Sequence, residues 1–308
     1  MGYVYHGSHN KGIKRLEPRK STHGVYVYAT TYKELATIFS GKCGDDLTYT
    51  IYRNDPSEPW ILVERVPSGF DVMFNNGASI YTLDDSSFKD IHTGFSEVVS
   101  EVGVDTLKEE EIENVYEELK KLDSDGKIKM YNYPNKPMDI PFDDSDLIEK
   151  EIEYCNRSNV PIKKELFNRL VYLHPNLINK VNDILSSLGL EMFTEMDIVN
   201  EFNYNIMRQM IDNKHERYLN SAYISITNCF PNLKQVLDEK MSIMNKDKNE
   251  QIDFIINNIP YINEIEKNNI RNRYINDERT ISEIGNELFE EIKKMAIESN
   301  NIQRWFRR

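Results

Sequence analysis

The chain of 308 residues has only three cysteines, no long hydrophobic run and no cluster of histidines. Cys43, Cys155 and Cys229 are far apart and lack the spacing of a metal site, which predicts free thiols in a reducing compartment. No apolar segment reaches the length of a membrane span, and the first residues lack the pattern of a signal peptide. We therefore expect a cytoplasmic protein with no metal site and no membrane partner.

Negative charge is concentrated in the middle of the chain. The formal net charge is −13, and residues 105–151 hold 15 acidic and 7 basic side chains. The segments on either side are close to neutral. Because an acidic segment repels polyanions, a protein is a better expected macromolecular partner than a nucleic acid.

Short runs of β-branched and aromatic residues dominate the first hundred residues. Turn residues separate them at intervals of about ten residues, which predicts an antiparallel sheet system. Residues 32–39 interrupt this series with a helical pattern. The predicted strands are residues 3–8, 24–30, 47–52, 60–66, 70–74, 79–83 and 96–100.

The second half has a different composition. Residues 107–122 already have helical periodicity, and a last strand is predicted at residues 127–133. Three prolines and the acidic cluster 143–146 follow, which predicts a solvated linker and a domain boundary near residue 148.

Helical patterns fill the rest of the chain. Residues 152–308 contain only two glycines, Gly189 and Gly285, and Gly189 stands where a glycine ends a helix. Thr280 and Glu283 have the spacing of a capping box. The predicted fold class is α+β, with an antiparallel β domain at residues 1–148 and an all-α domain at residues 149–308.

Polar groups stand at the ends of three predicted strands, in sequences with a recognisable order. These sequences are Tyr5-His6-Gly7-Ser8, Tyr26-Val27-Tyr28-Ala29-Thr30 and Phe95-Ser96-Glu97-Val98-Val99. Together they resemble the His-Tyr-Glu pattern of the ADP-ribosyltransferases, in the branch of the poly(ADP-ribose) polymerases and diphtheria toxin. The resemblance covers about residues 1–103.

The resemblance implies an N-terminal ADP-ribosyltransferase-like domain that uses NAD as its substrate. It implies that His6 binds the adenosine ribose, Gly7 the nicotinamide amide, Tyr28 the nicotinamide ring and Glu97 the ribose 2′-hydroxyl. The implied catalytic residues are Glu97, His6 and Tyr28, and the implied NAD-binding residues are His6, Gly7, Ser8, Tyr26, Tyr28, Ala29, Thr30 and Phe39.

These residue types suit the reaction. Breaking the bond between nicotinamide and ribose creates an oxocarbenium-like transition state, which a carboxylate stabilises. Flat aromatic side chains hold a nicotinamide ring, and strand alternation places Tyr26 and Tyr28 on one side, so that either could stack on it. Ile38, followed by Phe39, stands where polymerases have a second stacking tyrosine. Phe95 replaces the Glu or Gln of arginine-modifying relatives, which disfavours arginine as the acceptor.

Three functions are consistent with the sequence. The first is an NAD-dependent mono-ADP-ribosyltransferase that modifies an intracellular macromolecule, as a toxin, a defence protein or a phage factor does, with the helical domain selecting the target. The second is a non-catalytic module that binds NAD or ADP-ribose. The third is another NAD-related reaction, either hydrolysis of NAD or removal of a 2′-phosphate from RNA. RNA as substrate is disfavoured, because residues 1–103 hold 10 basic and 13 acidic side chains.

Overall fold

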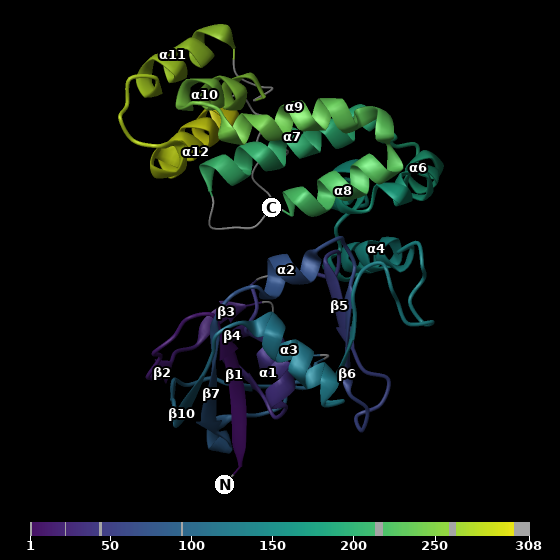
Figure 1. The fold of residues 1–308 in the computed structure, drawn as a ribbon, viewed down its shortest axis with the longest axis vertical. Helices are drawn as coiled ribbons and strands as arrows, with labels where there is room; N and C mark the ends of the chain where they lie inside the picture. Colours follow the sequence, from purple (N-terminus) through teal and green to yellow (C-terminus); the bar gives the residue numbers. More distant parts are fainter. Residues whose placement is uncertain are drawn as a thin grey trace. The chain divides into compact units, whose positions relative to one another are not determined.

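The computed structural model describes residues 2–21, 23–42, 45–93, 95–212, 218–258 and 263–298. The chain divides into two compact units, Met1–Asp139 and Ile140–Arg308. In the described residues the strands lie in the first unit, and the second contains helices (Figure 1). The predicted succession of an antiparallel β part and a helical part is confirmed. None of the described helices combines the length and the apolar character that crossing a membrane requires.

The first unit is built on a six-stranded antiparallel sheet with the order β10-β7-β1-β4-β3, in which β8 also pairs with β4. A second sheet has the order β11-β6-β5, with β11 parallel to β6, and β2 pairs with β9. The strands are β1 Tyr3–Ser8, β2 Arg15–Leu16, β3 Arg19–Ser21, β4 Gly24–Thr30, β5 Tyr49–Tyr52, β6 Trp60–Glu64, β7 Ala78–Asp84, β8 Glu97–Ser100, β9 Val104–Asp105, β10 Lys108–Ile112 and β11 Ile128–Tyr131.

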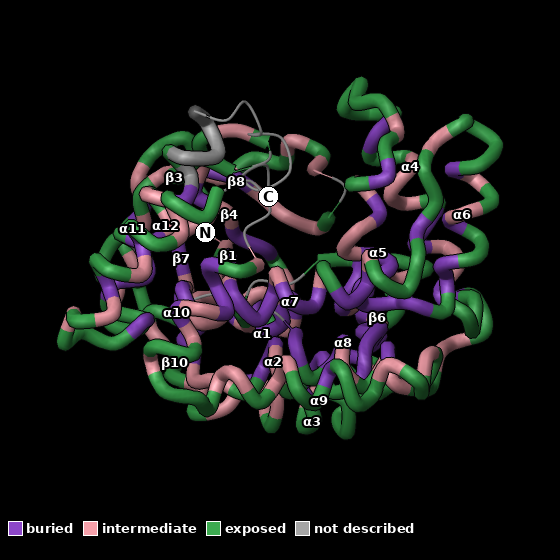
Figure 2. The backbone as a smooth tube through the Cα atoms, turned by 90° about the horizontal axis from the view of Figure 1, so that it is seen from above, coloured by how far each residue is buried: buried purple, intermediate pink, exposed green. Residues whose placement is uncertain are grey.

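Helix α1, Lys33–Phe39, packs on β1 (Figures 1 and 2). The two elements approach so closely that a Cβ on Gly7 would lie 1.9 Å from the carbonyl oxygen of Ala36. Only a glycine permits this approach. On the other face of the sheet, Val4, Ala29, Tyr81, Leu83 and Val104 form a hydrophobic core cluster.

Two predicted elements of the first unit are wrong. Residues 70–74 form helix α2, Gly69–Phe74, rather than a strand. Phe70, Met73 and Phe74 are buried at helical spacing, and the Glu64 carboxylate accepts a hydrogen bond from the Phe70 amide at the start of the helix. Residues 108–112 form the edge strand β10, and the helix α3, Val115–Ser124, begins later than predicted. The charged sequence of β10 suits an exposed sheet edge.

Nine α-helices and four short 3₁₀ helices make up the described part of the second unit. Buried residues on α7 and α12 face its core, including Ile284, Leu288 and Ile292 of α12. The helices are α4 Asp146–Ser158, η2 Lys164–Phe167, α5 Asn168–Leu173, η3 Pro175–Leu177, α6 Ile178–Ser187, α7 Glu195–Ile211, α8 Leu219–Cys229, η4 Pro231–Leu233, α9 Lys234–Ser242, η5 Ile243–Asn245, α10 Lys248–Asn257, α11 Glu264–Tyr274 and α12 Ile281–Glu298.

Both predicted helix-end signals of this unit are confirmed. The Glu283 carboxylate accepts a hydrogen bond from the Thr280 amide, and the Thr280 hydroxyl accepts one from the Glu283 amide. Gly189 follows α6 with a φ of +68°, and the amide of Leu190 donates to the carbonyl of Leu185. That bond closes a Schellman motif, in which glycine is the favoured residue.

The acidic segment at the predicted boundary belongs to the helical unit, and the division falls after Asp139 rather than near 148. The Asp143 carboxylate pairs with Lys180 at 2.6 Å. The backbone carbonyl of Asp143 accepts a hydrogen bond from the Asn176 side chain. Asp144 is buried, with its carboxylate 3.7 Å from Nδ1 of His174. These long-range contacts, which a local sequence pattern does not show, replace the predicted solvated linker.

Gly285 provides a test of the packing between α7 and α12. A Cβ on Gly285 would lie 1.9 Å from the carbonyl oxygen of Ile211. We expect Gly285→Ala to lower the free energy of unfolding by about 1–3 kcal/mol, the usual effect of overpacking. Without this contact the same substitution would stabilise an α-helix by up to about 1 kcal/mol. Chemical denaturation measures the difference, with Lys294→Ala on the exposed side of α12 as the control. A stabilised Gly285→Ala variant would contradict the close packing.

Candidate functional site

Three neighbouring strands bring together the polar residues that the sequence singled out. His6 and Gly7 lie on β1, Tyr28 lies on β4 and Glu97 begins β8. The registers are continuous, because Tyr5 pairs with Thr30 and Thr30 pairs with Glu97. Residues more than 60 positions apart in sequence therefore lie within one short stretch of the sheet.

Strands β1 and β4 pair only at Tyr5 and Thr30 and then separate. On its other side, β1 pairs with β7 along its whole length, and β4 pairs with β8 from Val27 to Thr30. Each strand thus keeps its outer partner while the edge between them opens beyond Tyr5. We call this opening, bordered by His6–Ser8 and by Val27–Ala29, the β1–β4 split.

The backbone of Gly7 faces the split. The carbonyl of Thr82, opposite Tyr5, accepts a hydrogen bond from Leu107 on the far side of β7. Since hydrogen-bonded and non-bonded pairs alternate along antiparallel strands, the backbone groups of Tyr5, and of Gly7 two residues on, point away from β7. The N–H and C=O of Gly7 therefore point toward the side from which β4 has separated. An amide ligand could bind to both groups.

His6 bridges the split. Its Nδ1 lies 2.7 Å from the carbonyl oxygen of Tyr28. A carbonyl oxygen can only accept, so Nδ1 carries the proton and donates it. Burial, together with the nearby positive charge of Arg19, lowers the pKa of His6 below 6.5, although the bond to Tyr28 opposes this shift. In the neutral ring Nε2 is an acceptor, suited to a ligand hydroxyl.

Aromatic side chains line the face of the sheet that α1 covers. Residues paired across strands share a face, so Gly7, Tyr28 and Glu97 lie on this side and His6 on the other. The rings of Tyr26 and Tyr28 meet edge to face with centroids 6.0 Å apart, which agrees with the predicted shared face. The Tyr28 hydroxyl is buried and has no hydrogen-bond partner among the described residues.

Phe39 connects α1 to the segment that carries the carboxylate. Its ring meets that of Phe95 edge to face, with centroids 6.1 Å apart. Phe95 lies two residues before Glu97 and is 42% exposed. The half-buried Phe39 therefore lies close to the start of β8.

One local and one long-range hydrogen bond hold the Glu97 segment. The Thr93 hydroxyl donates to a carboxylate oxygen of Glu97 at 3.0 Å. The buried Thr30 hydroxyl donates to the carbonyl of Ser96 at 2.7 Å, which fixes the backbone just before Glu97. Glu97 itself is half-buried, so a ligand could still approach its other oxygen.

Arg53 is a residue of this region that the sequence did not reveal. Its guanidinium lies 4.4 Å from the ring centroids of both Tyr32 and Trp60. It donates to the Ser96 hydroxyl at 2.7 Å, one residue before Glu97. An arginine between two aromatic rings is held by cation–π attraction. No local motif marks Arg53, because its partners lie up to 43 positions away.

Two predicted NAD-binding residues occupy other positions. Ala29 lies in the core cluster with Val4 and Tyr81, on the face opposite to Tyr28. Its side chain therefore does not point toward the aromatic face. The Ser8 hydroxyl accepts a hydrogen bond from the Asn10 amide and shapes the turn after β1.

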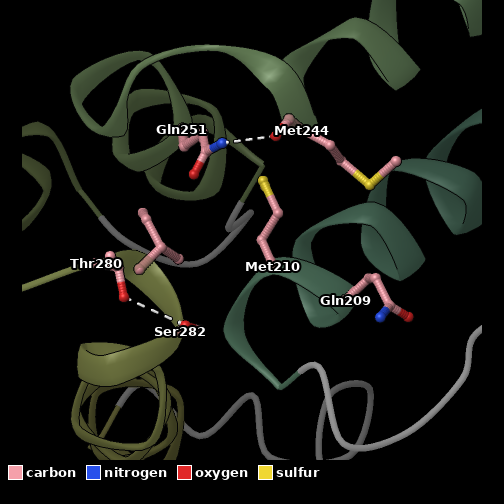
Figure 3. A pocket seen from close by; sticks show the side chains of 7 residues that line it. Gln209, Met210, Met244, Gln251, Thr280 and Ser282 are labelled. Carbon is pink, nitrogen blue, oxygen red and sulfur yellow. Dashed lines mark hydrogen bonds between the residues drawn. The ribbon is translucent and has the colours of Figure 1, made fainter.

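A separate cavity of about 300 Å³ lies within the helical unit (Figure 3). Gln251 donates to the carbonyls of Met244 and Lys246, and the Thr280 hydroxyl contacts Ser282. Among the described residues, no side chain with an acidic or basic group lines this cavity. Its lining residues are Gln209, Met210, Met244, Gln251, Thr280, Ile281 and Ser282.

Comparisons of the chain with models of protein families, with curated proteins and with solved structures find no significant match. In the described part of the chain, no three side chains of the metal-binding types come together. The geometry around the β1–β4 split is therefore the main structural indication of function.

The lowered pKa of His6 predicts a pH-dependent contribution to stability. Protonation of His6 favours the unfolded chain, because its pKa is lower in the folded protein than the unfolded value of 6.5. The contribution of neutral His6 to the free energy of unfolding is complete above pH 6.5. It is lost as the pH falls from 6.5 toward the pKa of His6 in the folded protein. Denaturation between about pH 7.5 and 5 should show a steeper loss of stability for the wild type than for His6→Gln. Equal slopes would contradict a neutral, bonded His6.

Proposed function

We propose that the first unit binds NAD across the β1–β4 split and transfers ADP-ribose from it to a macromolecular acceptor. The observation that carries this proposal is the opening of the sheet at Gly7, with His6, Tyr28 and Glu97 on the strands around it. The resemblance to His-Tyr-Glu transferases assigns a role in NAD binding or catalysis to these same four residues.

The nicotinamide end of NAD suits the face that α1 covers. A carboxamide both donates and accepts, and the backbone N–H and C=O of Gly7 offer the complementary pair. Tyr28 supplies an aromatic face from β4, and Phe39 supplies another from α1. Tyr26 packs against the edge of Tyr28, so Tyr28 is the proposed stacking residue and Tyr26 its support.

The two ribose units of NAD suit His6 and Glu97. The neutral Nε2 of His6 would accept a hydrogen bond from a hydroxyl of the adenosine ribose. The Glu97 carboxylate, held by Thr93 on one oxygen, would accept from the 2′-hydroxyl of the nicotinamide ribose. Its negative charge would also stabilise the positive charge that develops on that ribose.

In the proposed reaction, the bond between the ribose C1′ and the nicotinamide nitrogen breaks. Nicotinamide leaves with the bonding electron pair as a neutral molecule. A nucleophilic group of the acceptor bonds to C1′ and loses its proton to solvent or a nearby base. With water as the nucleophile, the same chemistry would hydrolyse NAD to ADP-ribose.

The helical unit is the proposed contact for a protein acceptor. It forms a compact unit of its own, so it could bind a partner separately from the NAD site. Arginine is a disfavoured acceptor, because Phe95 occupies the position at which arginine-modifying relatives carry Glu or Gln. A non-catalytic NAD-binding module is the second candidate, since the split and its aromatic residues would bind NAD equally well without turnover.

Glu97→Gln separates catalysis from binding. The substitution keeps the shape of the side chain and removes the charge that stabilises the transition state. We expect the rate of nicotinamide release from NAD to fall by about 100-fold or more, while the affinity for NAD changes little. Nicotinamide release and equilibrium NAD binding, measured with and without cell lysate as the acceptor source, report the two effects.

Glu101→Gln is the matched control for Glu97→Gln. Glu101 follows the same strand, is exposed and pairs with Lys89 at the surface. It should retain the wild-type rate of nicotinamide release. Equal activity in the wild type and Glu97→Gln would contradict the transferase. NAD binding without release in the wild type would favour the non-catalytic module.

Tyr28 and Tyr26 can be distinguished by nicotinamide binding. If Tyr28 stacks on the ring, Tyr28→Ala should weaken nicotinamide binding by about tenfold, because aromatic stacking contributes on the order of 1 kcal/mol beyond buried area. Tyr26→Ala, which removes only the supporting ring, should have a smaller effect. Isothermal titration with nicotinamide measures both affinities, and a larger loss in Tyr26→Ala would reverse the assignment.

A further inference from the structure

Arg19 lies at the edge of the candidate site, on a strand that the sequence analysis did not connect with it. Strand β3 pairs with β4, and Arg19 is opposite Tyr26. Because residues paired across antiparallel strands share a face, Arg19 projects on the same side as Tyr26 and Tyr28. Its exposed side chain is free to extend along the sheet toward the β1–β4 split.

The electrostatics of His6 agree with this position of Arg19. The positive charge of Arg19 contributes to the lowered pKa of His6. Arg19 is therefore placed by its pairing opposite Tyr26 of β4, and its charge acts on His6 of β1.

Arg19 also has no ion pair or hydrogen bond with any described residue, in contrast to several other cations of the first unit. Arg15 pairs with Glu17 and Asp105, and Lys33 pairs with Glu110. Arg53 is enclosed by aromatic rings. An arginine without an anionic partner beside a neutral imidazole is available for an anionic ligand.

We infer that Arg19 binds the diphosphate of NAD. This inference rests on the proposed function, in which nicotinamide lies at Gly7 and the adenosine ribose at His6. The diphosphate joins the two ribose units, so it has to lie at the split, between the nicotinamide at Gly7 and the adenosine ribose at His6. A guanidinium offers a planar pair of N–H donors that matches phosphate oxygens, and such charge-assisted bonds are among the strongest in proteins.

Equilibrium binding to Arg19 variants tests the inference. Arg19→Gln should weaken binding of NAD and of ADP-ribose by about tenfold or more, the effect of a lost charge-assisted hydrogen bond. Binding of nicotinamide riboside, which has no phosphate, should stay unchanged. Added salt should weaken NAD binding to the wild type more than to Arg19→Gln, because screening acts on the ion pair. Arg19→Lys, which keeps the charge, should recover part of the affinity.

Lys20→Gln is the matched control. Lys20 is the next residue of β3, is also exposed and pairs with Val25, so it projects on the opposite face. It should bind NAD as the wild type does. The inference about Arg19 is wrong if Arg19→Gln binds NAD with wild-type affinity, or if Lys20→Gln loses as much affinity as Arg19→Gln. Neither result would contradict the NAD site itself. If the wild type binds neither NAD nor ADP-ribose, both this inference and the proposed function are wrong.

Discussion

The candidate site depends on how β4 divides its pairing among β3, β8 and β1. Backbone N–H and C=O groups need partners, and β4 finds most of its partners on β8, along Val27–Thr30. It pairs with β1 only at Thr30. The edge of β1 from His6 onward is therefore left open, and polar backbone groups face a gap rather than a strand. A ligand with both donors and acceptors would complete this edge.

The packing of α1 stabilises this arrangement. The helix contacts β1 at Gly7, where the carbonyl of Ala36 takes the space that any larger side chain would need. It also brings Phe39 to the segment before Glu97. One glycine therefore has two roles, since it allows the helix to pack and leaves its own backbone groups facing the split. The hydrogen bond from His6 to the Tyr28 carbonyl holds the two strands together across it.

Much of the site could be predicted from local patterns. Strand alternation placed Tyr26 and Tyr28 on one face, and the ring contact agrees with it. The strand positions of His6, Tyr28 and Glu97 were also predicted, because each lies in a short β-branched run. The resemblance implies a binding role for Ala29, but strand alternation turns its side chain into the core.

The remaining features depend on contacts between distant residues. Arg53 is held by Tyr32, Trp60 and Ser96, none of which is its sequence neighbour. The charged run Lys108–Ile112 becomes a strand because β7 offers a free edge. The acidic cluster joins the helical unit because Lys180 and His174 lie beside it there. Periodicity within one segment contains no information about such partners.

The central claim is that the β1–β4 split is a dinucleotide site, and amide resonances measured during an NAD titration test it most directly. Glycine amides are well resolved in such spectra. Our account predicts a large shift of the Gly7 resonance, with smaller shifts along β4. Gly126 and Gly189, which lie in turns after α3 and α6, should not move. The site is supported if the Gly7 and β4 resonances shift with the same dependence on NAD concentration. An unchanged Gly7 resonance at saturating NAD would contradict it.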